Sequence, residues 1–173
     1  MTLVKGNLIY LVKQYITKNH GADIYAEVVS DLPELKGVIV SDGNYPLQTY
    51  QQLLRNCLDK FGEVEFAKLN RYLAEKQLSG ILGFVIKFIS ADRIMSSSQQ
   101  MWDRIYDEGK AEVVENTESA IRFRISEFRL TQAHIKGMEA YLKRIAEIAM
   151  KKDIKVTSAI VDEKTTEFMI YKG

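Results

Sequence analysis

The side chains that could support catalysis or metal binding are few in this chain and stand apart from one another. The only histidines are His20 and His134, and the one cysteine is Cys57. A metal site needs several histidine, cysteine or carboxylate ligands that converge on one point, and this spacing brings no such group together. A lone histidine seldom marks a site, so we expect His134 to be a partly exposed residue in the first turn of a helix.

Acidic side chains are the other groups that could support catalysis, because a carboxyl can act as a general acid or base when burial or a nearby charge shifts its pKa. These pairs lie in polar stretches that give no cause for such a shift: Glu63/Glu65, Asp107/Glu108 and Glu112/Glu115. The phosphate-binding, zinc-protease and serine-hydrolase motifs are absent from the sequence. Cys57 falls on an apolar helix face, where a free cysteine acts as a small hydrophobic side chain. We therefore expect a protein that is not an enzyme.

The composition is that of an ordinary globular protein. The chain has 173 residues, of which 46% are hydrophobic and 27% charged, enough for one domain with a substantial core. The net charge of +1 gives no reason to expect nucleic acid or an anionic membrane as a partner. No stretch approaches the roughly 20 apolar residues of a membrane span, and the N-terminus has no signal-peptide pattern. The expectation is a single domain, residues 1–173, in the cytoplasm.

The first two-thirds of the chain has helical periodicity. Gly62 and the pair Ser79-Gly80 are expected to separate helices, and Gly109 is expected to end the last of them. In that last helix, residues 92–107, the apolar face carries the chain's only tryptophan, Trp102. The predicted helices cover residues 3–19, 22–29, 46–61, 64–78, 81–89 and 92–107.

The remaining third alternates as strands do, around one long helix. Residues 110–115 and 119–126 form a predicted hairpin, residues 131–151 an amphipathic helix, and residues 155–172 a second hairpin with its loop at 162–165. Strands joined by hairpins pair antiparallel, which indicates an α+β fold. We expect an N-terminal helical layer packed with a four-stranded antiparallel sheet, in which the two hairpins are separated by the long helix.

Four stretches carry a resemblance to known proteins: Val4-Lys5-Gly6 opening a helix, Asn44-Tyr45-Pro46 entering the next, the segment from Trp102 to Gly109, and the final hairpin. Together they resemble an uncharacterised bacterial family abundant in myxobacteria. That family is similar to the ligand-binding domain superfamily of nitric-oxide signalling and Golgi transport. The superfamily includes haem-nitric oxide/oxygen-binding (H-NOX) domains, 4-vinyl reductase-type sensor domains and Bet3-like transport subunits. The resemblance implies an apolar cavity between the helical layer and the sheet.

The branches of this superfamily fill the cavity differently, and the resemblance sets an expectation for each. H-NOX domains ligate haem through a histidine on the helix before the sheet and hold the propionates with a Tyr-x-Ser-x-Arg motif. Residues 92–107 contain no histidine, and the chain lacks that motif. Reductase-type domains carry a cysteine-rich zinc site near the last hairpin, where residues 161–168 contain no cysteine. Bet3-like subunits hold an acyl chain on a cysteine, but no local motif matches at Cys57. Haem and zinc are therefore both expected to be disfavoured.

A cavity needs only apolar and aromatic walls with one or two polar groups that orient the ligand. The predicted walls, and thus the candidate ligand-binding residues, are Tyr50, Leu54, Leu82, Val85, Ile86, Met101, Trp102, Ile105 and Tyr106. Methionine and aromatic stripes at helical spacing also build solid cores, so both alternatives stay open at this point.

Two functions follow from these alternatives. The first is a non-enzymatic sensor or binding domain for a small apolar or aromatic molecule or a lipid chain, with Trp102 stacking on the ligand or donating its indole N–H to it. The second is a scaffold or protein-interaction module without a ligand, for which a homodimer is one candidate arrangement.

Overall fold

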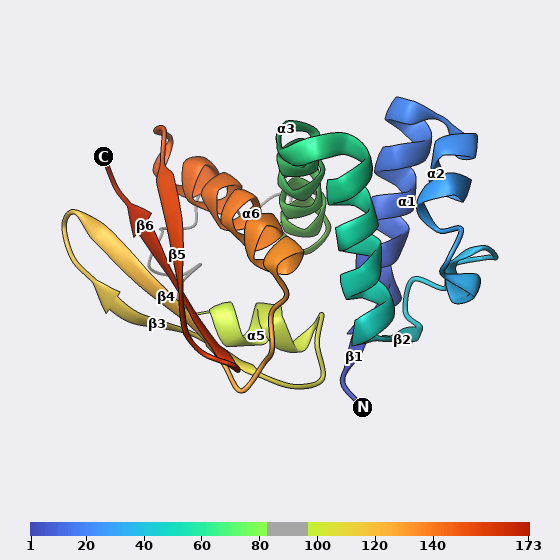
Figure 1. Ribbon diagram of the computed structural model, residues 1–173. Helices are drawn as coiled ribbons and strands as arrows, with labels where there is room; N and C mark the ends of the chain where they lie inside the picture. Colours follow the sequence, from blue (N-terminus) through green and yellow to red (C-terminus); the bar gives the residue numbers. More distant parts are fainter. Residues whose placement is uncertain (83–96) are drawn as a thin grey trace.

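Figure 1 shows the computed structural model of the chain, which describes residues 1–82 and 97–173, with no description of the side chains of residues 79–82. The helices lie on one side and a curved sheet on the other. Helices α1 (Gly6–His20) and α2 (Ala22–Val28) are farthest from the sheet, and α3 (Leu47–Leu82) stands between them and α6 (Gln132–Met150). Helix α6 covers one face of the sheet, so the fold is a stack of layers.

The N-terminal part agrees with the predicted helices and adds a small sheet. Helix α1 ends at Gly21, whose φ of 99° favours glycine. Strands β1 (Leu3–Lys5) and β2 (Asn44–Pro46) pair antiparallel and precede α1 and α3. This pairing was not predicted, because strands of three residues give too short a pattern to distinguish from helix entry. A 3-10 helix, η1 (Pro33–Leu35), completes this region.

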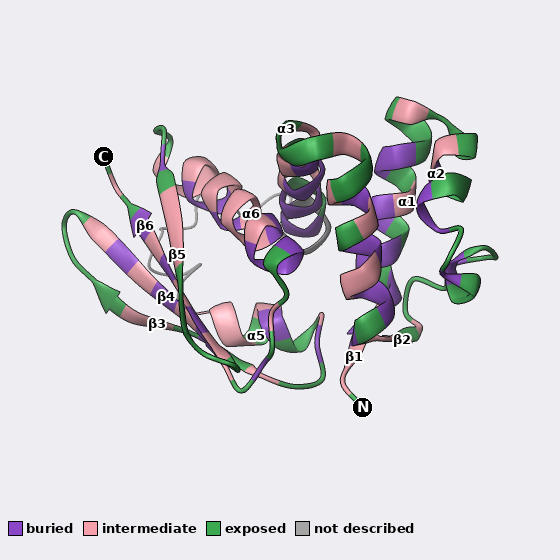
Figure 2. Cartoon of the chain, in the orientation of Figure 1, coloured by how far each residue is buried: buried purple, intermediate pink, exposed green. Residues whose placement is uncertain are grey.

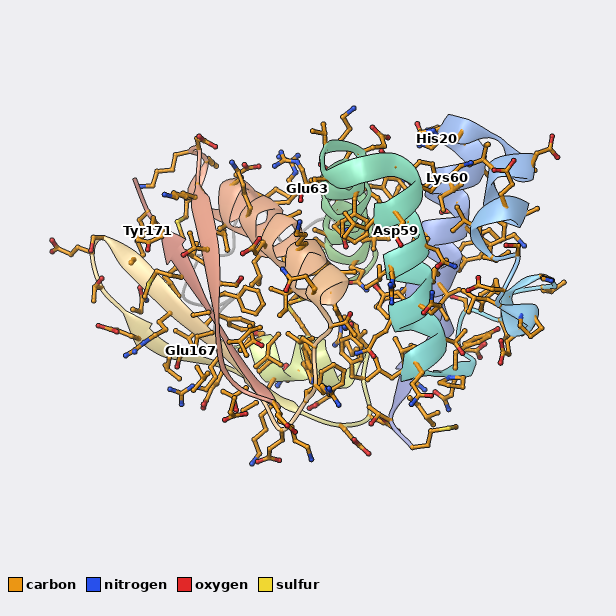
Figure 3. All side chains as sticks on the ribbon, in the orientation of Figure 1. His20, Asp59, Lys60, Glu63, Glu167 and Tyr171 are labelled. Atoms are coloured by element: carbon orange, nitrogen blue, oxygen red, sulfur yellow. The ribbon has the colours of Figure 1, made fainter. Side chains whose placement is uncertain are left out.

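Helix α3 consists of two segments that meet at Gly62, as the sequence predicts. Gly62 has φ 73° and ψ 172°, outside the helical region, and the chain reverses there. Figure 3 shows His20, Lys60 and Glu63 gathered around this turn. The predicted break at Ser79-Gly80 is wrong, because α3 continues to Leu82. Most of the predicted helix at residues 81–89 lies outside the described residues.

Helix α5 (Ser98–Asp103) is shorter than the helix predicted for residues 92–107, of which residues 92–96 are not described. It ends at Asp103 because the following residues pair with β1. The backbone N–H of Lys5 donates to the carbonyl of Ile105 at 2.8 Å, and Val4 forms an antiparallel bridge with Tyr106. The N-terminus is thereby fixed against the segment that follows Trp102.

The main sheet confirms the predicted α+β class with four antiparallel strands. Its order is β3-β4-β6-β5, so the two hairpins join through their second strands. One face is buried beneath α6, as the burial colours in Figure 2 show. The other carries charged side chains such as Arg124 and Glu167, which form an ion pair at 2.6 Å. The strands are β3 (Lys110–Asn116), β4 (Ala120–Ser126), β5 (Lys155–Asp162) and β6 (Thr165–Tyr171).

Helix α6 is held closely against α3. Its first turn is capped by Thr131, whose side chain accepts from the backbone N–H of His134 at 3.3 Å. A Cβ on Gly137 would lie 2.8 Å from Asn70 Oδ1, so glycine is needed for this close approach. Near the far end, Glu147 accepts from the Arg71 guanidinium at 2.8 Å. None of the described helices is long and apolar enough to span a membrane.

Candidate functional site

An apolar cavity of about 110 Å³ lies among α3, α5, α6 and the sheet. Helix α3 contributes Tyr50 and Leu73 to its walls, α6 contributes His134 and Met138, and the sheet contributes inward-facing side chains such as Ile121. None of the described lining residues is Asp, Glu, Lys or Arg. The cavity is thus walled by apolar and aromatic side chains, with a small number of polar groups among them.

Five of the nine predicted site residues come together on these walls: Tyr50, Met101, Trp102, Ile105 and Tyr106. Leu54 is buried in the core but does not line the cavity. Val85 and Ile86 lie outside the described residues, and the side chain of Leu82 is not described. The geometry places these five residues at one cavity, and their contact with a ligand stays a prediction.

Trp102 lies in a cluster of aromatic rings and is 4% exposed. Its ring centroid is 4.3 Å from that of Tyr106 and 4.9 Å from that of Phe128. The indole N–H donates to the carbonyl of Glu108 at 2.8 Å, so the expectation that it would donate to a ligand is wrong. A Cβ on Gly109, whose φ is +92°, would approach the Trp102 indole nitrogen to 3.1 Å. Trp102 therefore contributes its ring to the cavity wall, whereas its indole N–H is bonded within the protein.

His134 was expected to be partly exposed, but only 2% of it is exposed, and it lines the cavity. Its Nε2 lies 2.9 Å from the hydroxyl of Tyr106, and its ring makes an edge contact with Tyr50 at 5.7 Å. Burial lowers the pKa of His134 from 6.5 to about 3, so the imidazole is neutral at pH 7. A signal was present in the sequence: His134, Met138 and Leu142 recur every four residues on the apolar face of α6.

The polar side chains among the described cavity walls are all uncharged. Burial raises the pKa of Tyr50, of Tyr106 and of Tyr141 above the ordinary value of 10. Tyr141 donates its hydroxyl hydrogen to Gln77 Oε1. Such walls can bind and orient a molecule, and the described residues among them include no carboxyl group.

Cys57 lies outside this site. The thiol is fully buried, does not line the cavity, and has its pKa raised to about 12 by burial. A thiol of this kind is protonated and inaccessible at neutral pH. Within residues 1–82 and 97–173, no three histidine, cysteine, aspartate or glutamate side chains are grouped so that they could hold a metal ion.

No protein-family model matches the sequence, and no curated protein matches it. Solved structures do match. A crystal structure of an Fe(II) unliganded H-NOX protein mutant from K. algicida has a TM-score of 0.72 and 16% identity, over 98% of this chain and 96% of that one. An H-NOX protein from S. oneidensis in the Fe(II)NO ligation state gives a TM-score of 0.69 and 12% identity, over 96% and 97% of the two chains.

A third structure, described as "Modulating Heme Redox Potential Through Protein-Induced Porphyrin Distortion", has a TM-score of 0.69 and 12% identity, over 96% of this chain and 99% of that one. Identities this low show a shared fold and nothing finer. The chain has the fold of H-NOX proteins, which supports the broader resemblance, whereas no match supports the narrower myxobacterial family.

These matches correct the expectation that haem is disfavoured, because the structures that share this fold come from haem proteins. The expectation rested on the absence of histidine from residues 92–107 and of the Tyr-x-Ser-x-Arg motif, and it took His134 on α6 to be partly exposed. In its chemistry the donor set fits: a neutral, buried imidazole with a free ring nitrogen can ligate haem iron, and apolar walls suit a porphyrin. Sites for larger ligands occupy roughly 300–1,000 Å³, so a porphyrin would require the walls of this cavity of about 110 Å³ to move apart.

Proposed function

We propose that residues 1–173 form one ligand-binding domain of the sensor type, which holds a small and mostly apolar molecule between α3, α6 and the sheet. The observation that carries this proposal is the cavity itself. A scaffold without a ligand would have no need of unfilled apolar space, since empty space in a core lowers stability. The H-NOX fold of the chain supports the same role.

Binding would be driven by removal of apolar surface from water, at roughly 25 cal/mol per Å². The walls supply this surface from several elements at once: Met101 from α5, Val113 from β3 and Met138 from α6. A ligand here would contact the helical layer and the sheet together, so its presence would change how firmly the two layers hold each other.

Native mass spectrometry of freshly purified protein tests this proposal, together with fluorescence during titration with small hydrophobic compounds. Trp102 is the only tryptophan, so its emission reports on the cavity wall alone. We expect either a co-purifying mass that is lost on denaturation, or a saturable change in emission as a compound binds. Protein that carries no ligand and responds to no compound would contradict the proposal.

Haem is a second candidate ligand, favoured by the unpartnered ring nitrogen of His134 and by the haem proteins that share the fold. Nδ1 of His134 would hold the iron in the tautomer whose Nε2 carries the hydrogen and donates it to Tyr106, and bound haem would supply an iron centre to which a diatomic gas can bind. The role of the chain would be to hold the iron through a neutral imidazole and to keep water out with apolar walls.

Absorbance during hemin titration separates this candidate from the first. If haem is the ligand, the wild-type protein develops a saturable Soret band that His134→Phe alters or abolishes. The matched control is His20→Gln, which removes the other histidine, at the end of α1, and should leave the spectrum unchanged. The same spectrum from all three proteins would contradict ligation by His134.

A further inference from the structure

The inference that follows rests on the small-molecule role proposed above and concerns which ligands the cavity accepts. We infer that the cavity selects uncharged compounds of about the size of a single ring that carry a hydrogen-bond acceptor, and that His134 and Tyr50 provide the donors that recognise this acceptor.

The first part of the argument concerns charge. The described walls contain no acidic or basic side chain, and the histidine among them is neutral at pH 7. The ion pair of Arg71 with Glu147 joins α3 to α6, but neither residue lines the cavity. A charged ligand would lose its hydration without gaining a partner of opposite charge, which is unfavourable in an apolar environment.

The second part concerns the hydrogen on His134. Tyr106 has one hydroxyl hydrogen, and the only hydrogen bond of its hydroxyl in the described structure is to His134 Nε2, at 2.9 Å. If the tyrosine donates, Nε2 accepts and the imidazole hydrogen sits on Nδ1. If Nε2 donates instead, both the tyrosine hydrogen and the Nδ1 lone pair are left unpaired. The first arrangement leaves fewer polar groups unsatisfied, so Nδ1 is assigned as an N–H donor.

That donor has no partner in the protein. Nδ1 of His134 is buried and makes no hydrogen bond within the described part of the chain. Buried polar groups are nearly always paired, and a native exception calls for an explanation. A ligand acceptor would supply the missing partner once the ring, which lines the cavity, turns Nδ1 to the cavity surface.

Tyr50 gives the same end of the cavity a second hydroxyl. Its ring meets that of His134 at 87° with centroids 5.7 Å apart, and its hydroxyl has no hydrogen-bond partner among the described residues. Four other polar side chains on the walls already donate to the protein. These bonds run from Trp102 Nε1 to Glu108 O, from Tyr141 Oη to Gln77 Oε1, from Ser98 Oγ to Ala111 O and from Asn70 Nδ2 to Phe66 O.

The third part concerns size. An apolar cavity of about 150 Å³ in another protein stays dry and binds benzene or xenon. The volume here, about 110 Å³, is of the same order. A compact ring with one oxygen acceptor therefore matches the space, with its apolar body against residues such as Leu73, Met138 and Ile145.

Three probes of similar size separate these properties. Cyclohexanone carries a carbonyl acceptor, methylenecyclohexane replaces that oxygen with a methylene group, and cyclohexylammonium carries a positive charge at pH 7. Their affinities are measured on full-length protein labelled with ¹³C in its methionine methyl groups. Met101, Met138 and Met150 line the cavity, whereas Met169 pairs with Arg122 on the opposite face of the sheet and is the internal reference.

Tyr50→Phe and His134→Phe are the test variants. Each is expected to weaken cyclohexanone about three- to tenfold while methylenecyclohexane binds as before or tighter, because one hydrogen bond is lost. Tyr50→Phe removes an oxygen atom that has no protein partner, so the packing of the protein is kept. This variant therefore tests the inference even if His134→Phe folds poorly. The control is Tyr25→Phe, which removes a buried hydroxyl that donates to Leu35 O, away from the cavity, and should leave every affinity unchanged.

The outcomes distinguish this inference from the proposed function. Unchanged cyclohexanone affinity in both variants, or equally tight binding of cyclohexylammonium, overturns the inference while the binding role stands. If none of the three probes shifts Met101, Met138 or Met150 in the wild-type protein, both the inference and the binding role are wrong.

Discussion

Helix α3 faces two regions of different character. Part of it is packed solid: Leu53, Phe66 and Leu69 are at most 1% exposed, and none of them lines the cavity. Toward α6 and the sheet, Tyr50, Leu73 and other α3 side chains face the cavity. One helix thus belongs to a filled core on one side and to a wall of the cavity on the other.

The difference follows from the residues opposite α3. The cavity walls include three alanines, Ala111, Ala146 and Ala149, and three flexible methionines, Met101, Met138 and Met150. Alanine leaves space that leucine would fill, and methionine adapts to the contents of a gap. The unpartnered Nδ1 of His134 also belongs to a residue of these walls. Space and polarity thus occur together, which favours a binding role for this region.

The largest effect should come from truncation on the filled side. Phe66→Ala should cost about 3–5 kcal/mol of unfolding free energy, because it opens a cavity in solid packing. Leu142→Ala, on the cavity wall and 8% exposed, should cost about 2 kcal/mol, since its surroundings are already incomplete. Urea denaturation measures both. Equal losses would mean that the two regions are packed alike.

Adding volume should have opposite effects in filled packing and at the cavity wall. Ala74 is fully buried and does not line the cavity, so Ala74→Ile should destabilise the protein by about 1–3 kcal/mol through overpacking. Ala146→Ile should be neutral or raise stability by up to about 1 kcal/mol, because the added carbons enter existing space. It should also abolish probe binding. Thermal unfolding with and without cyclohexanone checks both statements, and destabilisation of similar size by both substitutions would contradict them.

The two histidines extend the comparison to pH. Burial depresses the pKa of His134 from 6.5 to about 3. As the pH falls, this histidine therefore binds a proton in the unfolded chain at a higher pH than in the folded protein. This group should therefore remove about 2 kcal/mol of stability between pH 7 and pH 5. His134→Phe should lose that dependence, and His20→Gln should keep it. Denaturation of the three proteins at both pH values is the measurement, and parallel curves for wild type and His134→Phe would show that His134 is not buried neutral.

The smallest effect is expected at the exposed cluster around His20, near the turn of α3 in Figure 3. There Glu65 accepts from Lys68 at 2.9 Å and from the Tyr15 hydroxyl at 2.7 Å, and these bonds lower its pKa from 4.5 to about 2. A depressed carboxyl pKa stabilises the fold above pH 4.5, and that stabilisation is lost as the pH falls toward 2. Glu65→Gln should cost less than about 1 kcal/mol at pH 7 and nothing near pH 2. A constant difference across this range would contradict the assignment.

Much of the fold could be predicted, because its elements are long and periodic. The two hairpins, helix α6 and the turn at Gly62 lie close to where the sequence places them. The β1-β2 pair could not be found, since three-residue strands depend on a partner about 40 residues away. The break predicted at Ser79-Gly80 failed because local turn preference is weaker than the packing of a long helix.

The candidate site was predicted in part, and for a physical reason. Aromatic and apolar residues such as Trp102 and Tyr106 are expected inside on hydrophobicity alone. His134 was missed because a histidine carries no such preference, and its burial depends on a long-range hydrogen bond to Tyr106. The four-residue spacing of His134 with Met138 and Leu142 was the available signal.

The central claim is that the space between α3, α6 and the sheet is unfilled and accessible to a ligand. Crystals pressurised with xenon test this most directly, because xenon enters apolar cavities without requiring a specific contact. The claim predicts one strong xenon peak bounded by Tyr50, Trp102, His134 and Met138, which disappears in Ala146→Ile. A wild-type crystal without that peak, in which these side chains meet and fill the space, would contradict it.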